Sequence, residues 1–161
     1  MGRAWKYGDD INTDVLYPGR YLDSYESSYL AAHALEDLDP DFAKNVKEGD
    51  VIVGGKYFGC GSSREQAASA LKYCGVKAVI AKSFARIYYR NAINMGIPPI
   101  ETPDVDKIND GDEIELDMEN GIIHNRTTGE DIPFNPLPPF IMEIINDGGL
   151  VPHLKKKLGT D

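Results

Sequence analysis

The sequence predicts an α/β fold with a βαβ unit and a β-hairpin region toward its C-terminus. Two apolar runs typical of buried strands, at 51–53 and 76–81, are each followed by a helical pattern, and this order implies parallel strands. The 16 glycines and 10 prolines indicate many short turns, which favours a mixed fold over a helical bundle. Farther on, residues 113–117 alternate polar and apolar side chains, and Asn120 with Gly121 is a strong hairpin-turn signal.

The remaining elements follow from local signals. A short first strand precedes a polar, turn-rich loop over residues 6–14. Periodicity predicts helices at 27–38, 62–74, 84–95 and 140–146. Ser83 is a candidate cap for the third of these helices, and Gly75 and Gly96 fit the residues that end the second and third. The helix at 140–146 is the last one expected, and the basic tail from Lys155 is expected to fray.

Length and charge restrict the classes of function. A chain of 161 residues fits one domain spanning residues 1–161. Its 17 basic and 26 acidic residues, a net charge of −9, argue against binding to nucleic acid or to an anionic membrane surface. A small anionic substrate remains compatible, because a local cationic site can lie in an acidic protein. The sequence has no apolar run near the roughly 18 residues of a membrane span, and its start lacks a secretory signal.

Cysteine and histidine positions predict neither a disulfide scaffold nor a metal site. The cysteines are Cys60 and Cys74, and their spacing matches no zinc or iron–sulfur pattern. The histidines His33, His124 and His153 are scattered along the chain. We therefore expect no metal in this chain and a reducing, cytoplasmic setting.

One glycine-rich segment carries the residues expected to do chemistry, Gly59-Cys60-Gly61-Ser62-Ser63-Arg64-Glu65-Gln66. It follows a strand and leads into a helix, whose unpaired N–H groups and dipole attract anions. Glycines let the backbone approach a ligand, and the planar guanidinium of Arg64 suits a carboxylate or a phosphate. The segment therefore predicts an anion site with two hydroxyls beside it.

Two alternatives for this segment differ in strength. Ser62 with Glu65 fits a capping box, and Ser63 with Gln66 fits its variant, so either serine has a purely structural explanation. A nucleotide loop is a weaker match. The segment lacks the Gly-Lys-Ser/Thr of a P-loop, and Arg64 stands where the dinucleotide fingerprint has its third glycine.

Three segments together resemble the swivelling domain of the aconitase and isopropylmalate dehydratase family. The first is the family's G-S-S-R-E motif, present here as Gly61-Ser62-Ser63-Arg64-Glu65. The second is an N-terminal loop at 9–14 that ends in Thr13-Asp14, and the third is 81–87 followed by Asn91 and Gly96. The resemblance covers nearly the whole chain. It implies a compact swivelling β/β/α domain of the size of a separate small subunit.

The resemblance implies a hydro-lyase, which moves a hydroxyl between neighbouring carbons by removing water and adding it back. In such enzymes a separate large subunit carries a four-iron iron–sulfur cluster. This chain is therefore expected to hold no cofactor and to act only with that partner, on a small di- or tricarboxylic acid.

The substrate expected first is isopropylmalate, with 2-isopropylmalate and 3-isopropylmalate interconverted in leucine biosynthesis. Homoaconitate and methyl- or dimethylmalate remain alternative substrates. An anion-binding regulatory module remains the non-enzymatic alternative, and self-association of the isolated chain stays open.

Matched residue by residue, the family pattern implies that Ser62 is the catalytic base in its alkoxide form. Ser63 is implied as a hydrogen-bond donor to the substrate, and Arg64 as the clamp on a substrate carboxylate. Asp14 matches an aspartate near the family's site and is expected to support substrate binding, with loop capping as the alternative. Arg86 is expected to make structural bonds.

The resemblance also implies a substrate-specificity loop formed by Arg20, Tyr21, Leu22, Asp23 and Ser24. Tricarboxylate-using relatives place an arginine near the position of Asp23, and a carboxylate there repels a third substrate carboxylate. This difference favours an alkyl-substituted malate. Arg20 is a second candidate for contact with the substrate, and Tyr21 and Leu22 have an alternative role as core residues that anchor the loop.

Overall fold

The computed structural model describes residues 2–21, 26–61 and 65–159. Within these residues one sheet has the strand order β4-β3-β2-β1-β5-β6-β7. Its strands are β1 Gly2–Lys6, β2 Val51–Val53, β3 Ala78–Ala81, β4 Pro99–Glu101, β5 Glu113–Asp117, β6 Ile122–Asn125 and β7 Glu130–Pro133. Strands β1 to β4 pair in parallel, whereas β5 to β7 form an antiparallel meander attached to β1.

The helices are α1 Thr13–Leu16, α2 Ser27–His33, α3 Phe42–Asn45, α4 Glu65–Tyr73, α5 Arg86–Asn94, α6 Pro139–Asn146 and α7 Leu150–Lys157, with short 3-10 turns at Gly19–Tyr21 and Val105–Lys107. The order β2–α4–β3–α5–β4 confirms the predicted βαβ unit, and the pair β5–β6 confirms the predicted hairpin. Among the helices of the described residues, none combines the length and the apolar character needed to cross a bilayer.

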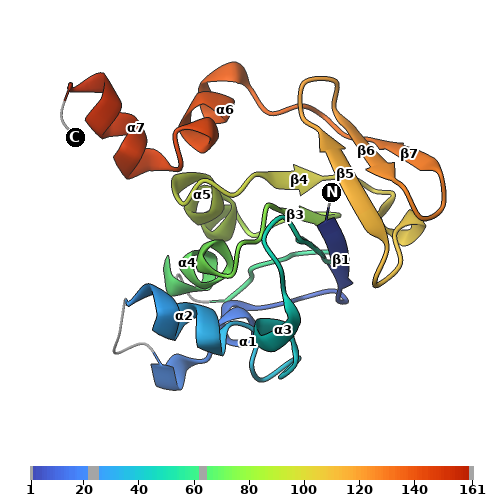
Figure 1. Ribbon diagram of the computed structural model, residues 1–161, viewed down its shortest axis with the longest axis horizontal. Coiled ribbons are helices and arrows are strands. Elements are labelled where there is room, and N and C mark those ends of the chain that lie inside the picture. The colour runs from blue at the N-terminus through green and yellow to red at the C-terminus, as the bar shows by residue number, and fades with distance from the viewer. Residues whose placement is uncertain (1, 22–25, 62–64, 160–161) are drawn as a thin grey trace.

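Two hydrophobic cores lie on opposite faces of the parallel strands, because successive strand side chains point to opposite sides. Trp5 and Ile52 pack with the apolar side chains of helices α1 to α5. Val51 and Ile80 point the other way and pack with the buried side chains of the meander. In Figure 1, α2 and α4 lie to the left of β1 and β3, and the meander of β5 to β7 lies to the right. Burial on both faces explains why β2 and β3 are continuously apolar in sequence.

The helix predicted over residues 27–38 is shorter than expected, because α2 ends at His33. The chain leaves the helix through Ala34, which is extended at ψ 129°, and Leu35, which has a left-handed φ of +56°. Both side chains are fully buried. Packing of this turn into the core therefore outweighs the local helical preference.

The C-terminal tail does not fray at Lys155 as predicted, because it belongs to helix α7. The turn before α7 contains Gly148 and Gly149, and the ammonium of Lys72 lies 2.7 Å from the carbonyl oxygen of Gly148. Three lysines fall in the last turn of α7, where they stabilise the negative end of the helix dipole: Lys155, Lys156 and Lys157. Packing against α5 and α6 stabilises a segment whose periodicity alone is weak.

Candidate functional site

The three sequence motifs meet where the parallel strands β1, β2 and β3 end. The loop after β1 and the glycine-rich loop after β2 run side by side. Their backbones are joined by four hydrogen bonds of 2.7–3.0 Å, from Gly55 N to Gly8 O, Asp10 N to Lys56 O, Gly59 N to Ile11 O and Thr13 N to Cys60 O. The carboxyl ends of parallel strands are where α/β proteins bind ligands. The pairing therefore places the two loops at the expected edge of the sheet.

The loop after β3 joins the same group through Phe58. The N–H of Phe58 donates to the carbonyl of Ser83 at 3.0 Å, and the N–H of Ala85 donates to the carbonyl of Phe58 at 2.9 Å. The side-chain hydroxyl of Ser83 accepts a hydrogen bond from the N–H of Tyr57 at 2.8 Å. The prediction that Ser83 caps the next helix is therefore wrong. Ala85 is the N-cap residue of α5, and Arg86 is its exposed first residue.

Close packing at two positions requires glycine. A Cβ on Gly59, whose φ is +82°, would lie 2.2 Å from the ring of Tyr88. A Cβ on Gly55 would lie 1.8 Å from Oδ1 of Asp9, the oxygen that accepts a hydrogen bond from Lys56 N at 2.7 Å. These glycines thus let the loop after β2 pack closely against the loop after β1 and against helix α5, in addition to the approach to a ligand that the sequence suggested.

The structure describes both sides of the G-S-S-R-E motif. Gly61 is exposed and has a left-handed φ of +97°, and Glu65 is the exposed first residue of the nine-residue helix α4. Ser62, Ser63 and Arg64, the predicted base, donor and clamp, lie outside the described residues. Their roles therefore remain predictions made from the motif.

Asp14 lies in the first turn of α1 and is exposed. Asn12 caps this short helix, because its side chain accepts a hydrogen bond from Val15 N at 2.9 Å. Thr13, between them, is buried and bonded to the glycine-rich loop. Asn12 thus caps α1, and the backbone bond of Thr13 to Cys60 holds this turn next to the glycine-rich loop. The role of Asp14, in substrate binding or in loop capping, remains a prediction. The capping role of Asn12 was not predicted, although asparagine is among the residues that most often cap the start of a helix.

Arg20 and Tyr21 lie against the end of α2 and the turn that follows it. The guanidinium of Arg20 bonds to Asp37 and Glu36, and the ring of Tyr21 stacks on His33. Leu22, Asp23 and Ser24 of the predicted specificity loop lie outside the described residues. The acidic pair was overlooked, although two carboxylates after a helix C-terminus oppose its dipole and thus indicate a cationic partner.

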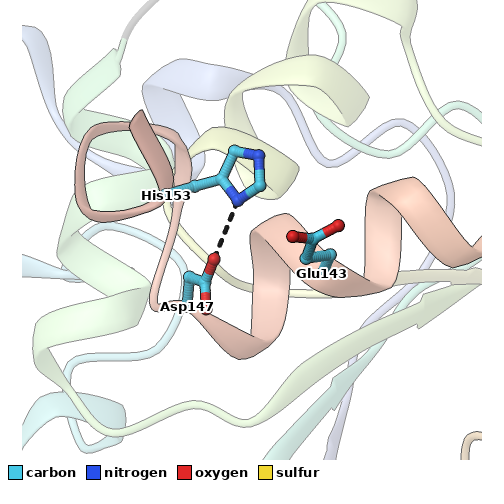
Figure 2. Close-up of side chains that lie close together, drawn as sticks. All are labelled: Glu143, Asp147 and His153. Carbon is cyan, nitrogen blue, oxygen red and sulfur yellow. Dashed lines mark hydrogen bonds and ion pairs between the residues drawn. The ribbon is translucent and has the colours of Figure 1, made fainter. Parts of the chain in front are cut away.

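The fold brings His153 next to two carboxylates, a contact that the sequence pattern did not predict. Figure 2 shows His153 of α7 facing Asp147 and Glu143 at the end of α6, and the nitrogen and oxygen ligand atoms of the three residues lie within 4.8 Å of one another. Nδ1 of His153 lies 2.8 Å from Oδ2 of Asp147, and the ammonium of Lys156 lies 3.2 Å from Oδ1. The ammonium of Lys156, a cation of the protein itself, therefore already contacts Asp147. The group acts as a polar link between α6 and α7.

This link is expected to make stability depend on pH at the acid end. The hydrogen bond to His153, followed by that to Lys156, holds the pKa of Asp147 below its ordinary value. A carboxyl with a lowered pKa stabilises the fold above the unfolded-state pKa of about 3.9, and this contribution disappears as pH falls through the lower folded-state value. Asp147→Asn should therefore lower the melting temperature at pH 7 and change it less and less below about pH 4. Melting curves followed by circular dichroism from pH 7 to pH 3 test this, and a difference that stays constant with pH would contradict it.

An open hollow of about 830 Å³ lies elsewhere, between the turn after β5 and helix α6. Its walls include Met118, Leu137, Met142 and Glu143. It contains no residue of the three motifs, so the candidate site and this hollow are separate features of the surface.

Comparison with known proteins gives a consistent result. The profile of the family described as "Aconitase C-terminal domain" matches residues 10–105, which include all of the N-terminal loop motif except Asp9, and both of the other motifs in full. The chain is 58% identical over 155 residues to 3-isopropylmalate dehydratase small subunit 1 of Archaeoglobus fulgidus, with 96% of each chain covered. It is 54% identical over 158 residues to the isopropylmalate/citramalate isomerase small subunit of Methanocaldococcus jannaschii, with 98% of this chain and 94% of the relative covered.

The fold is also similar to a solved structure. A crystal structure of 3-isopropylmalate dehydratase from Methanocaldococcus jannaschii superposes with a TM-score of 0.93. The two sequences are 52% identical, and the match covers 98% of this chain and 93% of the other. Sequence and fold therefore agree over nearly the full length.

Proposed function

Since the chain belongs to the aconitase C-terminal domain family, we propose that it is the small subunit of a 3-isopropylmalate dehydratase. In this role it forms one swivelling β/β/α domain and contributes to interconverting 2-isopropylmalate and 3-isopropylmalate by loss and return of water. The observation that carries the proposal is the 58% identity over 96% of both chains to a small subunit of that name. The TM-score of 0.93 supports the matching fold.

The proposed complex includes a large subunit that carries a four-iron cluster. The cysteines of this chain agree with a cluster that is held by the large subunit. Its two cysteines are fewer than such a cluster needs, and burial raises the pKa of the Cys74 thiol to about 11, which disfavours the thiolate that binds iron. When bound, the cluster supplies a Lewis acid for the leaving hydroxyl of the substrate.

The proposed contribution of this chain is the proton transfer. Ser62, as an alkoxide, takes the proton from the carbon next to a substrate carboxylate, while the hydroxyl leaves the neighbouring carbon. Ser63 donates a hydrogen bond to the substrate, and Arg64 binds a carboxylate through its two-pronged guanidinium. Asp14 supports this site from α1. These roles are carried over from the motif, and the position of its flanking residues at the carboxyl ends of parallel strands supports them.

Activation of Ser62 needs more than the helix that follows it. A helix N-terminus stabilises an anion by about 0.3–1 kcal/mol when exposed and by up to ~2 kcal/mol when partly buried. A neutral serine is a very weak base, and this gain in free energy is too small to turn it into an alkoxide. Arg64 and groups of the large subunit must therefore supply most of the stabilisation, in a site closed to water. This requirement explains why the chain is proposed to be active only in the complex.

Reconstitution tests the proposed function. We expect the chain mixed anaerobically with its cluster-bearing large subunit to dehydrate isopropylmalate, and neither subunit to do so alone. Citramalate is the most informative competing substrate, because it is part of the name of one relative. Homoaconitate completes the comparison, measured as kcat/KM for each acid. A complex with no activity toward isopropylmalate, or full activity of the isolated chain, would overturn the proposal.

A further inference from the structure

The guanidinium of Arg20 is engaged by two carboxylates on the turn after α2. Its Nη1 lies 2.9 Å from Oδ2 of Asp37, and its Nη2 lies 2.6 Å from Oδ1 of the same carboxylate. Nη2 also donates to Oε2 of Glu36 at 2.9 Å. This is the two-pronged geometry in which arginine binds a carboxylate most strongly. The bond to Arg20 holds the pKa of Asp37 below its ordinary value, so this partner stays charged over the neutral range.

The next residue, Tyr21, is held by aromatic contacts and through its backbone. Its ring stacks on the imidazole of His33, with centroids 3.7 Å apart and planes at 12°, and meets the ring of Tyr29 edge-on. The hydroxyl of Tyr17, a fully buried residue, donates to the carbonyl oxygen of Tyr21 at 3.0 Å. The guanidinium of Arg20 lies over the Tyr21 ring, 4.8 Å from its centroid. Together these contacts tie two consecutive residues to α2 and the turn after it.

We propose that Arg20 and Tyr21 are positioning residues, which fix the backbone at the point where it enters residues 22–25 and do not bind the substrate themselves. The inference rests on the proposed function and on the specificity loop that the family resemblance implies, in which the residues after Tyr21 are expected to recognise the variable group of the substrate. The charges of Glu36 and Asp37 already balance Arg20, so moving it to a substrate would break three hydrogen bonds, two of them to Asp37 and one to Glu36.

Asp37→Asn separates the positioning role from direct contact. The variable alkyl group takes no part in the chemistry, so poorer binding of it should raise KM and leave kcat nearly unchanged. On the positioning role, Asp37→Asn and Arg20→Ala each raise KM for isopropylmalate by up to about fivefold, and the double variant is no worse than either one. If Arg20 instead bound the substrate, Asp37→Asn would release it and leave KM unchanged or lower. That result would overturn the inference.

Arg126→Ala is the matched control. Arg126 pairs with Glu115 across β5 and β6, and these side chains are 48% and 45% exposed, close to 54% and 47% for Arg20 and Asp37. Exposed ion pairs contribute little to stability. Loss of the Arg20 pair and loss of the Arg126 pair should therefore lower the melting temperature by similar small amounts. Only the Arg20 and Asp37 variants should change KM. Exchanging the charges, as Arg20→Asp with Asp37→Arg, should recover part of the lost affinity.

Hydrogen exchange on the isolated chain tests the anchor without relying on activity. The amides of Arg20 and Tyr21 should exchange several-fold faster in Asp37→Asn than in the wild type, and at the wild-type rate in Arg126→Ala. Unchanged exchange in Asp37→Asn would overturn the anchoring role even in an active complex. If the wild-type complex does not act on isopropylmalate, the proposed function fails, and the exchange measurement still decides whether Arg20 anchors this segment.

Discussion

Replacement of Ser62 by alanine is expected to lower kcat of the reconstituted complex by about 10²–10⁴-fold, the contribution of a well-placed general base. On the proposed assignment the serine oxygen accepts the proton from carbon, and a methyl group cannot. The interaction acts in the transition state, so kcat and kcat/KM should fall by equal factors. Steady-state kinetics with isopropylmalate at saturating large subunit measure both.

Ser69→Ala is the matched control for this change. Ser69 lies on α4, within its first turns, and its hydroxyl donates to the carbonyl oxygen of Glu65 at 3.1 Å. The control removes a serine hydroxyl from the helix that follows the motif, and kcat should stay within about twofold of the wild type. If Ser62 serves only as a helix cap, Ser62→Ala should cost about 1 kcal/mol of stability and leave kcat near the wild-type value. That pattern would contradict the catalytic assignment.

Gly59→Ala is expected to lower the free energy of unfolding by about 3 kcal/mol, from two independent causes. The left-handed φ of +82° disfavours any residue with a Cβ, and this Cβ would lie 2.2 Å from the ring of Tyr88. Tyr88 has no room to move away, because it is 2% exposed and packs against the rings of Phe58 and Phe84. Chemical denaturation followed by circular dichroism measures the loss.

Gly111→Ala separates the two causes. Gly111 has a similar φ of +89°, but an added Cβ would meet no atom within 4 Å. The substitution should therefore cost the backbone penalty alone, about 1–2 kcal/mol. Equal losses for the two variants would show that the contact with Tyr88 contributes nothing. A larger loss for Gly59→Ala would show that the glycine-rich loop is closely packed against α5.

Local patterns were sufficient for most elements of the fold. The strands β2 and β3 are apolar because they are buried on both faces, and α4 and α5 lie where periodicity and the glycines at 75 and 96 predicted them. The hairpin of β5 and β6 follows from alternation and an Asn-Gly turn. The predictions that were wrong are those in which distant packing decides. The hydroxyl of Ser83 bonds to Tyr57 instead of capping α5, and α7 is stabilised by packing on α5 and α6.

The order of residues by itself determined the α/β class, the parallel and hairpin regions, the acidic surface and the motif that identifies the family, because these depend on neighbours in sequence. Tertiary structure alone decided that three loops from β1, β2 and β3 join through backbone hydrogen bonds, and that Arg20 is held by Asp37 and Glu36. Those contacts join segments far apart along the chain. Their partners are selected by the register of the sheet and by burial, which no local pattern encodes.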